Sequence, residues 1–381
     1  MFEYQKHGRY FAQCARGVED LLVDELRELG APAADARVRG VGFRADPGLL
    51  YDVVLRSRLA GRVLAPLLTF DCHSDRYLYA TARKLDWDAI LSPDRTFAVV
   101  ANVSRSNISH SQFAAQRLKD AVVDHFRESC GRRPSVDRRE PDVWLNLHIN
   151  RDRAVIALDV SGGSLHRRGY RLESVEAPLQ ETLAAAVLRL SGWDCEAPLV
   201  DFMCGSGTFL AEAWLQASRI PPGWRGVAAA SAAACLPDFD AEIWRRVVER
   251  ARVDHRRPAS GLVSGGDVDE AAVRAARANL ASLPGGEAVQ VTRADFRDVA
   301  VPAGAVIVVN PPYGVRLQER ARVGALYKDL GDHLKRRCRG AEAWVLCGDV
   351  ELVKRIGLHP KRRIPLWNGG LECRLVQFEL Y

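Results

Sequence analysis

The sequence predicts an α/β protein whose carboxyl-terminal part folds around a parallel sheet and whose front part is a smaller α+β sheet domain. Two short apolar runs carry the first prediction: residues 199–208 read Leu-Val-Asp-Phe-Met-Cys-Gly-Ser-Gly-Thr, and residues 306–313 read Val-Ile-Val-Val-Asn-Pro-Pro-Tyr. Each run stops at a polar turn, as expected for a strand buried on both faces of a parallel sheet. Because ligands bind beyond the carboxyl ends of such strands, we expect both turns to border one crevice.

Short helices and strands alternate in the front part. Helices are expected over 21–29, 49–60 and 111–128, where apolar residues recur at helical spacing. Strands are expected over 41–44, 96–103, 143–149 and 154–160, the last two as a hairpin. Residues 161–164 mark a linker, and a basic segment follows it. Four of its residues are candidate phosphate contacts, with a solvated loop as the alternative: His166, Arg167, Arg168 and Arg171.

The first apolar run ends at Asp201 and leads through Gly205 and Gly207 to a helix expected from about Thr208. Glycine permits a tight turn that a ligand can approach closely, and the first N–H groups of the helix can bind an anion. The match to Gly-x-Gly-x-x-Gly is incomplete because position 210 is Leu, and no Lys-Ser or Lys-Thr follows as in a triphosphate-binding loop. The turn indicates a nucleotide-type cofactor site, with a purely structural turn as the alternative.

Two further strands are expected to end in carboxylates, Asp267 after residues 262–266 and Asp295 after residues 289–294. An acid at the end of the second strand can accept hydrogen bonds from both ribose hydroxyls. The acid after the third strand could accept from the exocyclic amine of an adenine. Each acid alone could be a helix N-cap, but three acids at successive strand ends favour a cofactor site.

The second apolar run leads into the turn Asn310-Pro311-Pro312-Tyr313. Proline has a fixed φ and no N–H, so this turn is rigid, which suits a site that holds acceptors in fixed positions. The carbonyls of the Asn310 side chain and the Pro311 backbone can hold an exocyclic –NH2 group and direct its lone pair at an electrophile. The Tyr313 ring can stack on the base that carries the amine. Asn310, Pro311 and Tyr313 are therefore the predicted catalytic residues, and a structural turn with Tyr313 in the core is the alternative.

Taken in this order, the residues resemble the class I S-adenosylmethionine-dependent methyltransferases that act on exocyclic amines. The chain as a whole is similar to the THUMP-domain RNA methyltransferases, and most to the amino-terminal half of the bacterial 23S rRNA guanine-N2 methyltransferase. The matching stretches are residues 15–22, 111–113, 118–124, 133–138, 165–171, 177–185 and 368–375. Two positions depart from the family pattern: Asp201-Phe202 replaces Asp-Pro, and Gln180 stands where Lys or Arg is common. The second departure weakens any role of position 180 in contacting charge.

The resemblance implies a ferredoxin-like segment over 1–50, a THUMP RNA-binding domain over 51–163, a basic linker over 164–180 and a Rossmann-like class I methyltransferase domain over 181–381. The implied cofactor is S-adenosylmethionine, and the implied substrate is a guanine of 23S rRNA, methylated at N2. A monomer or weak dimer is expected. The implied cofactor-binding residues are Thr182, Asp201, Cys204, Gly205, Ser206, Gly207, Thr208, Asp267, Asp295 and Asn310.

Composition bounds these expectations. The 381 residues allow two or three domains, and a hydrophobic content of 48% supports a sizeable core. The sequence has no apolar run of about 18 residues that would predict a membrane span and no apolar signal core at its start. Nine cysteines without a Cys-x-x-Cys pair argue against a disulfide framework or a zinc cluster, so we expect no metal and a reducing cytoplasm. Residues 1–171 hold 27 Lys and Arg against 22 Asp and Glu, an excess compatible with RNA phosphate contact.

Several points stay open at this stage. Residues 219–260, rich in Pro, Ala and Arg around a helix near 242–252, are expected to be an insertion beside the crevice, without an assigned role. The substrate could be tRNA guanine in place of 23S rRNA, or adenine N6 in DNA, although the front domain argues against DNA. A different class is a non-catalytic RNA-binding or ribosome-assembly factor, against which the intact Asn310 and Tyr313 argue.

Overall fold

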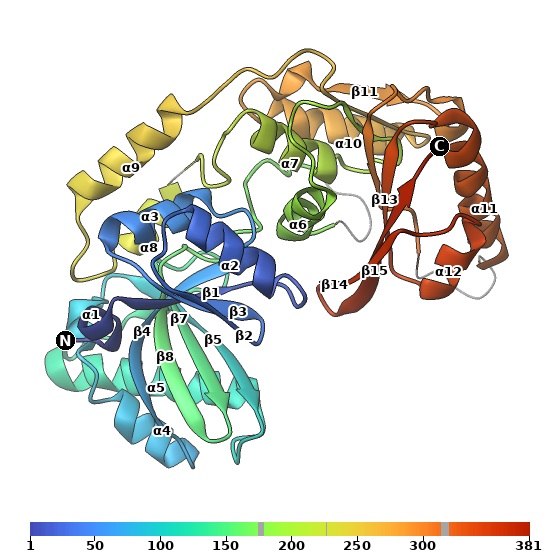
Figure 1. Cartoon of the computed structure of the whole chain (residues 1–381). Helices are drawn as coiled ribbons and strands as arrows, with labels where there is room; N and C mark the ends of the chain where they lie inside the picture. The colour runs from blue at the N-terminus through green and yellow to red at the C-terminus, as the bar shows by residue number, and fades with distance from the viewer. Residues whose placement is uncertain (174–178, 226, 314–319) are drawn as a thin grey trace. The chain divides into compact units, whose positions relative to one another are not determined.

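The computed structural model describes residues 1–173, 179–225, 227–313 and 320–381. The chain forms two compact units, and each is described by itself (Figure 1). The first unit comprises residues 1–14, 22–165 and 223–250, and the second comprises residues 15–21, 166–222 and 251–381. Each unit is therefore built from three separate segments of the chain, whereas the sequence was expected to form continuous domains one after another.

One eight-stranded sheet runs through the whole first unit, in the order β2-β3-β1-β4-β8-β7-β5-β6. The long strand β4 joins its two halves, because Leu64 pairs with Phe11 of β1 and residues 64–71 pair with β8, with a register shift between Pro66 and Leu68. The strands are β1 (Arg9–Gln13), β2 (Ala34–Arg37), β3 (Gly40–Arg44), β4 (Arg62–Asp71), β5 (Thr96–Ser104), β6 (Ser135–Val136), β7 (Val143–Asn150) and β8 (Arg153–Asp159).

The helices of the front part are α1 (Glu3–His7), α2 (Glu19–Glu28), α3 (Pro47–Arg56), α4 (Asp75–Ala82) and α5 (Ser111–Cys130), with a 3-10 turn η1 (Trp87–Ala89). The expected helix over 49–60 was wrong at its end. Ser57 leaves the helix with φ −63° and ψ 126°, and its hydroxyl donates to the buried Glu25 carboxylate at 2.5 Å. The same carboxylate accepts from the Arg58 backbone N–H at 2.8 Å, so a long-range acceptor replaces the last helical turn.

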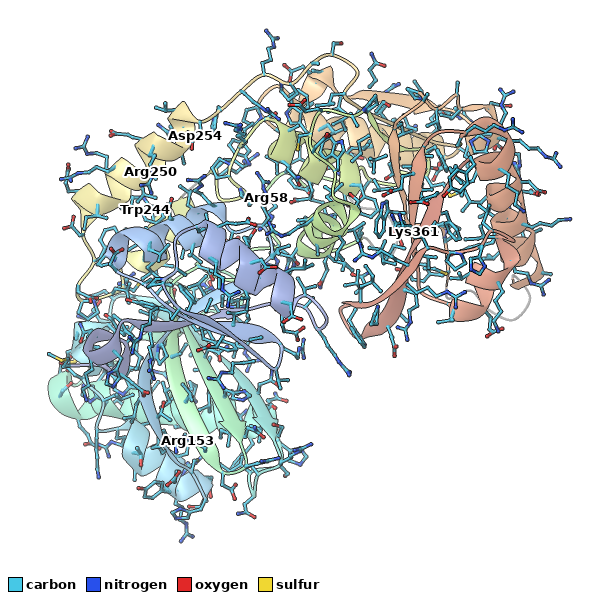
Figure 2. The ribbon with its side chains drawn as sticks, in the orientation of Figure 1. Arg58, Arg153, Trp244, Arg250, Asp254 and Lys361 are labelled. Carbon is cyan, nitrogen blue, oxygen red and sulfur yellow. The ribbon has the colours of Figure 1, made fainter. Side chains whose placement is uncertain are left out.

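Residues 223–250 complete the first unit with α8 (Val227–Ala233) and most of α9 (Ala241–Val253). The Tyr51 hydroxyl of α3 accepts from the Asp240 N–H at 2.9 Å, and the Tyr51 ring lies 5.5 Å, centroid to centroid, from Trp244. Arg250, labelled with Trp244 on α9 in Figure 2, donates to Asp52 of α3 at 2.5 Å. Of the segment 219–260, expected to be an insertion beside the crevice, residues 223–250 thus pack on α3 in the first unit, whereas its two ends belong to the second unit.

A seven-stranded sheet forms the second unit, in the order β11-β10-β9-β12-β13-β15-β14. The neighbours from β11 to β13 are parallel, whereas β15 is antiparallel to both β13 and β14. The strands are β9 (Leu199–Asp201), β10 (Val263–Asp267), β11 (Gln290–Arg293), β12 (Val306–Val309), β13 (Glu342–Cys347), β14 (Arg362–Asn368) and β15 (Leu371–Glu379).

Helices cover both faces of this sheet, with α11 and α12 on one face and α6, α7 and α10 on the other (Figure 1). Buried β-branched and aromatic residues fill the space under α11, among them Ile307, Val345 and Tyr327. The elements are α6 (Glu181–Ser191), α7 (Thr208–Ala217), α10 (Glu270–Ala281), α11 (Arg320–Arg337) and α12 (Val350–Arg355), with 3-10 turns η2 (Gly286–Ala288) and η3 (Phe296–Asp298).

The strand order reverses between β9 and β12, which pair through Leu199 with Val306 and Val200 with Ile307. A point where the order of parallel strands reverses leaves a crevice at the carboxyl ends, where ligands of such sheets bind. The glycine turn follows β9 and the Asn-Pro-Pro-Tyr turn follows β12. The fold therefore brings both predicted turns to one edge of one sheet.

Candidate active site

The turn after β9 is held by backbone bonds to the neighbouring strand β10. The Cys204 N–H donates to the Gly266 carbonyl at 3.0 Å, and the Gly205 N–H donates to Asp267 Oδ2 at 2.9 Å. Gly207 has φ +81°, and a Cβ there would lie 3.1 Å from the Ala276 Cβ of α10. Glycine is required at this position both for the left-handed backbone and for the close approach of the helix.

The three strand-end acids have different local roles. Asp267 accepts from Gly205 N–H at 2.9 Å and from Asp269 N–H at 3.0 Å, so it joins the glycine turn to the start of α10. Asp295 caps η3 and is bound by Arg297, whose Nη1 lies 2.6 Å from Asp295 Oδ2. Both carboxylates are at least partly exposed and retain acceptor capacity beyond these bonds.

Asp201 lies under the turn, with 1% of its surface exposed, and accepts from the Met203 N–H at 3.1 Å. Burial raises the pKa of its carboxyl well above the usual range, and the charge of Asp267 raises it further. Burial also raises the pKa of the Cys204 thiol, with the charges of Asp201 and Asp267 adding to the effect, so this thiol stays protonated at neutral pH. Thr182 is buried on the first turn of α6. Direct cofactor contact by these residues stays a prediction.

In the turn after β12, the Asn310 side-chain oxygen is buried, and no hydrogen-bond partner for it exists within residues 1–173, 179–225, 227–313 and 320–381. Pro311 is buried and Pro312 is exposed. An acceptor taken out of water without a partner costs about 1–3 kcal/mol. Such a group is well suited to a ligand that brings a donor.

Tyr313 is half-buried and packs against Gly348, which follows β13. A Cβ on Gly348 would lie only 2.4 Å from the Tyr313 ring carbon Cδ2, so the ring occupies the space that a side chain there would need. Burial raises the pKa of the Tyr313 phenol, and the side chains of Asn368, Cys373 and Asn310 lie close enough to its hydroxyl to influence that pKa. Asn368 also accepts from the Gln180 N–H at 3.4 Å.

Sequence reasoning gave no role to Gly348 or Asn368. Asn368 stands in the stretch 368–375 that carried part of the family resemblance, so a signal for it existed. Gly348 had none, because a single glycine after an apolar strand is ordinary. Both lie beside Tyr313 only because the fold brings the ends of β12, β13 and β14 together.

The basic segment 166–171 is anchored inside the second unit at two of its arginines. Arg168 is 4% exposed, and its Nε lies 3.6 Å from Glu212 Oε1 of α7. Arg171 donates to the side chains of Glu181, Ser206 and Thr208 and to the Leu179 carbonyl. Arg167 is exposed and His166 is half-buried. RNA contact by these residues stays a prediction, and the partners observed for Arg168 and Arg171 are intramolecular.

Within the described ranges, no group of three or more His, Cys, Asp and Glu side chains is arranged to hold a metal ion. The helices of the same ranges include none that is both long enough and apolar enough to cross a membrane.

A glycine turn and a carboxylate at adjacent strand ends, on a sheet of this strand order, define the α/β class of proteins that bind a nucleotide-type cofactor. Known families agree with this class: residues 168–377 match the family described as "RMKL-like, methyltransferase domain", residues 73–159 match the THUMP domain, and residues 9–64 match the RlmL ferredoxin-like domain. The chain belongs to the RMKL-like methyltransferase family, in the form that carries the ferredoxin-like and THUMP domains.

Two curated relatives are similar over almost the whole chain. One, from Synechocystis sp., is described as "Putative RNA methyltransferase slr0064" and is 40% identical over 98% of this chain and 97% of its own length. The other is the ribosomal RNA large subunit methyltransferase K/L of Syntrophotalea carbinolica, 44% identical over 98% of this chain and 53% of its own length. The chain spans about half the length of the K/L relatives it matches.

A solved structure extends the similarity to the cofactor. The crystal structure of SMU.472, described as "a putative methyltransferase complexed with SAH", has a TM-score of 0.85 and 27% identity, and the match covers 98% of each chain. The cofactor of this enzyme class is S-adenosylmethionine, and the residues present fit it. The left-handed Gly205 and Gly207, the start of α7 at Thr208 and the carboxylate of Asp267 meet at the end of β9.

Proposed function

We propose that the protein transfers a methyl group from S-adenosylmethionine to the N2 amine of a guanine in 23S rRNA. The Syntrophotalea relative, named as a ribosomal RNA large subunit methyltransferase, supports the substrate class, and the THUMP domain supports RNA as the partner. The guanine-N2 position rests on the family resemblance and on the chemistry of the turn after β12.

The observation that carries the proposal is the buried, unpartnered Asn310 Oδ1 at the end of β12, as far as the described ranges extend. An exocyclic amine brings two N–H donors, so one can satisfy this oxygen and the other a backbone carbonyl of the same turn. Both bonds pull the amine hydrogens toward the turn and out of the plane of the base, so the nitrogen lone pair is directed away from the turn. The amine is thereby oriented as a nucleophile.

S-adenosylmethionine, when bound, supplies a methyl group already activated by its sulfonium. Positioning then supplies much of the acceleration, because alignment alone lowers a two-body barrier by about 7–11 kcal/mol at most. Asn310 holds the amine, and Tyr313 offers a ring face to the guanine. Burial raises the pKa of Tyr313, Cys347 and Cys373, so none of these neighbours is a base at neutral pH. The methylated nitrogen then loses its extra proton to water.

Residues 1 to about 165 would supply most of the RNA affinity. The excess of Lys and Arg over residues 1–171 includes the exposed Arg133, Arg138 and Arg139 between α5 and β7. Replacing these three by Gln in the full chain should weaken RNA binding. The slope of the logarithm of the binding constant against the logarithm of the salt concentration should become shallower by roughly 0.7–0.9 per lost phosphate contact. Undiminished affinity and salt slope would remove this surface from the interface.

Nucleoside mass spectrometry of rRNA and tRNA tests the function directly. A strain lacking the protein should lose one N2-methylguanine in 23S rRNA, and the wild-type gene, but not its Asn310→Ala form, should restore it. Loss of the modification from tRNA alone would replace rRNA by tRNA as the substrate. Loss of an N6-methyladenine, with N2-methylguanine unchanged, would overturn the guanine proposal.

A further inference from the structure

The Arg171 guanidinium connects the segment before α6 to the cofactor turn. Its Nε donates to Glu181 Oε1 at 2.9 Å, and its Nη1 donates to Ser206 Oγ at 3.0 Å. Its Nη2 donates to the Leu179 carbonyl at 3.0 Å and to Thr208 Oγ1 at 3.1 Å. One side chain therefore bonds to the start of α6, to the glycine turn and to the first residue of α7.

The geometry uses properties that only arginine has. A guanidinium presents five N–H donors in one rigid plane, and the four bonds above use four of them. The Arg171 side chain is 18% exposed and the Glu181 side chain is 6% exposed, so the ion pair between them is largely shielded from water. Lysine would keep the charge but could not reach Glu181, Ser206 and Thr208 together.

A second side chain holds the same turn from α10. Asn279, fully buried, accepts from the N–H groups of Leu172 and Glu173 at 2.7 and 3.0 Å. Its amide nitrogen donates to the Glu173 carbonyl at 2.9 Å and to the Ser206 carbonyl at 3.0 Å. The side-chain oxygen of Ser206 is thus bonded to Arg171, and its backbone oxygen to Asn279.

We infer that Arg171 is a positioning residue for cofactor binding, which sets the conformation of the Ser206–Thr208 part of the glycine turn, and that it is not an RNA phosphate contact. Because both hydroxyl oxygens accept from the guanidinium, their O–H groups are directed away from Arg171 and remain donors. Glu181 neutralises the charge of the guanidinium. The turn therefore presents oriented hydroxyls and helix N–H groups, without a further net positive charge. This arrangement suits the zwitterionic amino-acid end of the cofactor.

This inference rests on the cofactor site of the proposed function, so the first measurement is calorimetric binding of S-adenosylhomocysteine to the wild-type full chain. Absence of binding would defeat the proposed function itself. If the wild type binds, Arg171→Lys should weaken the affinity about 10-fold, because the turn loses the guanidinium bonds that hold it in its binding conformation and must be ordered when the cofactor binds. RNA affinity, measured without cofactor, should stay within about 2-fold of the wild-type value, because Arg171 is not expected to contact RNA.

Two further variants keep the test decisive. Ser206→Ala removes one acceptor of Arg171 and leaves the Glu181 ion pair intact, so it answers the question even if Arg171→Lys fails to fold. The two substitutions should be non-additive in a double-mutant cycle on cofactor affinity, which a purely structural role of Arg171 elsewhere would not produce. Arg167→Ala, the exposed neighbour, is the matched control and should leave cofactor affinity unchanged.

Wild-type cofactor affinity in both Arg171→Lys and Ser206→Ala would overturn the inference. It would also be overturned if Arg171→Lys weakened RNA binding and left cofactor binding intact, which is the outcome expected of a surface phosphate contact.

Discussion

The two turns at the edge of the second sheet differ in how completely their polar groups are bonded. In the glycine turn after β9, the backbone of Cys204 and Gly205 bonds to β10, and Ser206 is held by both Arg171 and Asn279. In the turn after β12, the Asn310 oxygen is buried and lacks a partner in the part of the chain that the structure describes. The conformation of the glycine turn is thus fixed by bonds within the protein, whereas the turn after β12 holds an acceptor that a bound donor would satisfy.

This difference separates binding from chemistry. A cofactor that must bind in one pose is served by a turn whose shape does not depend on it, because little ordering remains to be done on binding. A reacting amine is better served by an acceptor that has no competing partner, since every bond it makes is then made with the substrate. We therefore expect substitutions in the two turns to affect different measurements.

The largest effect is expected at Asn310. Asn310→Ala should lower the single-turnover rate of methyl transfer by roughly 100-fold or more, the size of losing a preorganised polar partner. Cofactor affinity should stay at the wild-type value, because the glycine turn keeps all its bonds, and a clear loss of affinity would show instead that Asn310 also binds the cofactor. Single-turnover assays at saturating cofactor and RNA, with calorimetry beside them, measure both. An unchanged rate would mean that the amine is held elsewhere.

Asp267→Ala should have the opposite profile. It removes the acceptor of Gly205 and Asp269 N–H groups and should weaken cofactor binding by about 1.5–3 kcal/mol, the range for bonds to a charged group. Once cofactor is saturating, the transfer rate should recover. Glu270→Ala, at an exposed acid on α10, is the matched control. Wild-type calorimetric affinity in Asp267→Ala would remove this residue from the cofactor site.

Tyr313 separates ring from hydroxyl. Tyr313→Ala should lower the transition-state stabilisation of methyl transfer by about 1–3 kcal/mol, the value of stacking one base on an aromatic ring. Tyr313→Phe keeps the ring and removes only the hydroxyl, so the loss in transition-state stabilisation should be at most about 0.5–1.5 kcal/mol, the value of one neutral hydrogen bond. Pre-steady-state rates for both variants measure this. Equal damage would show that the hydroxyl, and not the ring face, is what the reaction needs.

Gly348→Ala tests the packing under that ring. The new Cβ would lie 2.4 Å from the Tyr313 ring, so either the ring or β13 must move. We expect a cost of about 1–3 kcal/mol, as for overpacking elsewhere, seen mainly in the transfer rate and little in cofactor affinity. Gly370→Ala meets open space within 4 Å and is the control. A wild-type rate in Gly348→Ala would show that the ring position is not critical.

The smallest effect concerns the pH dependence of stability. The pKa of Asp201 is raised in the folded chain, first by burial, so the folded state binds more protons than the unfolded state between its unfolded value, about 3.9, and the raised value. The free energy of unfolding should fall as pH rises through this window, by at most about 1.4 kcal/mol per pH unit. Asp201→Asn should flatten that slope in denaturant titrations from pH 4 to 8, and an unchanged slope would contradict the assignment.

Much of the fold and the main outline of the site could be predicted from the sequence. The runs 199–201 and 306–309 are short and apolar because their strands are buried on both faces, and this pattern is local. The turns after them carry Gly205, Gly207, Asn310 and Tyr313 for reasons of backbone geometry and donor chemistry that are equally local. The family resemblance added the front domains, which matching families support.

Only the tertiary structure decided how the remaining polar groups are used. Arg171 reads as one member of a basic run, yet its guanidinium bonds to residues 179, 181, 206 and 208. Residues 223–250 lie between two strands of the second sheet in sequence, yet they pack on α3 of the first unit. A hydrophobic period records which face of an element is buried, but it does not record which distant group will satisfy a buried donor. These partners come from residues that are distant in sequence and become neighbours only when the chain folds. The sequence alone therefore cannot distinguish a surface arginine from one that holds a turn in place.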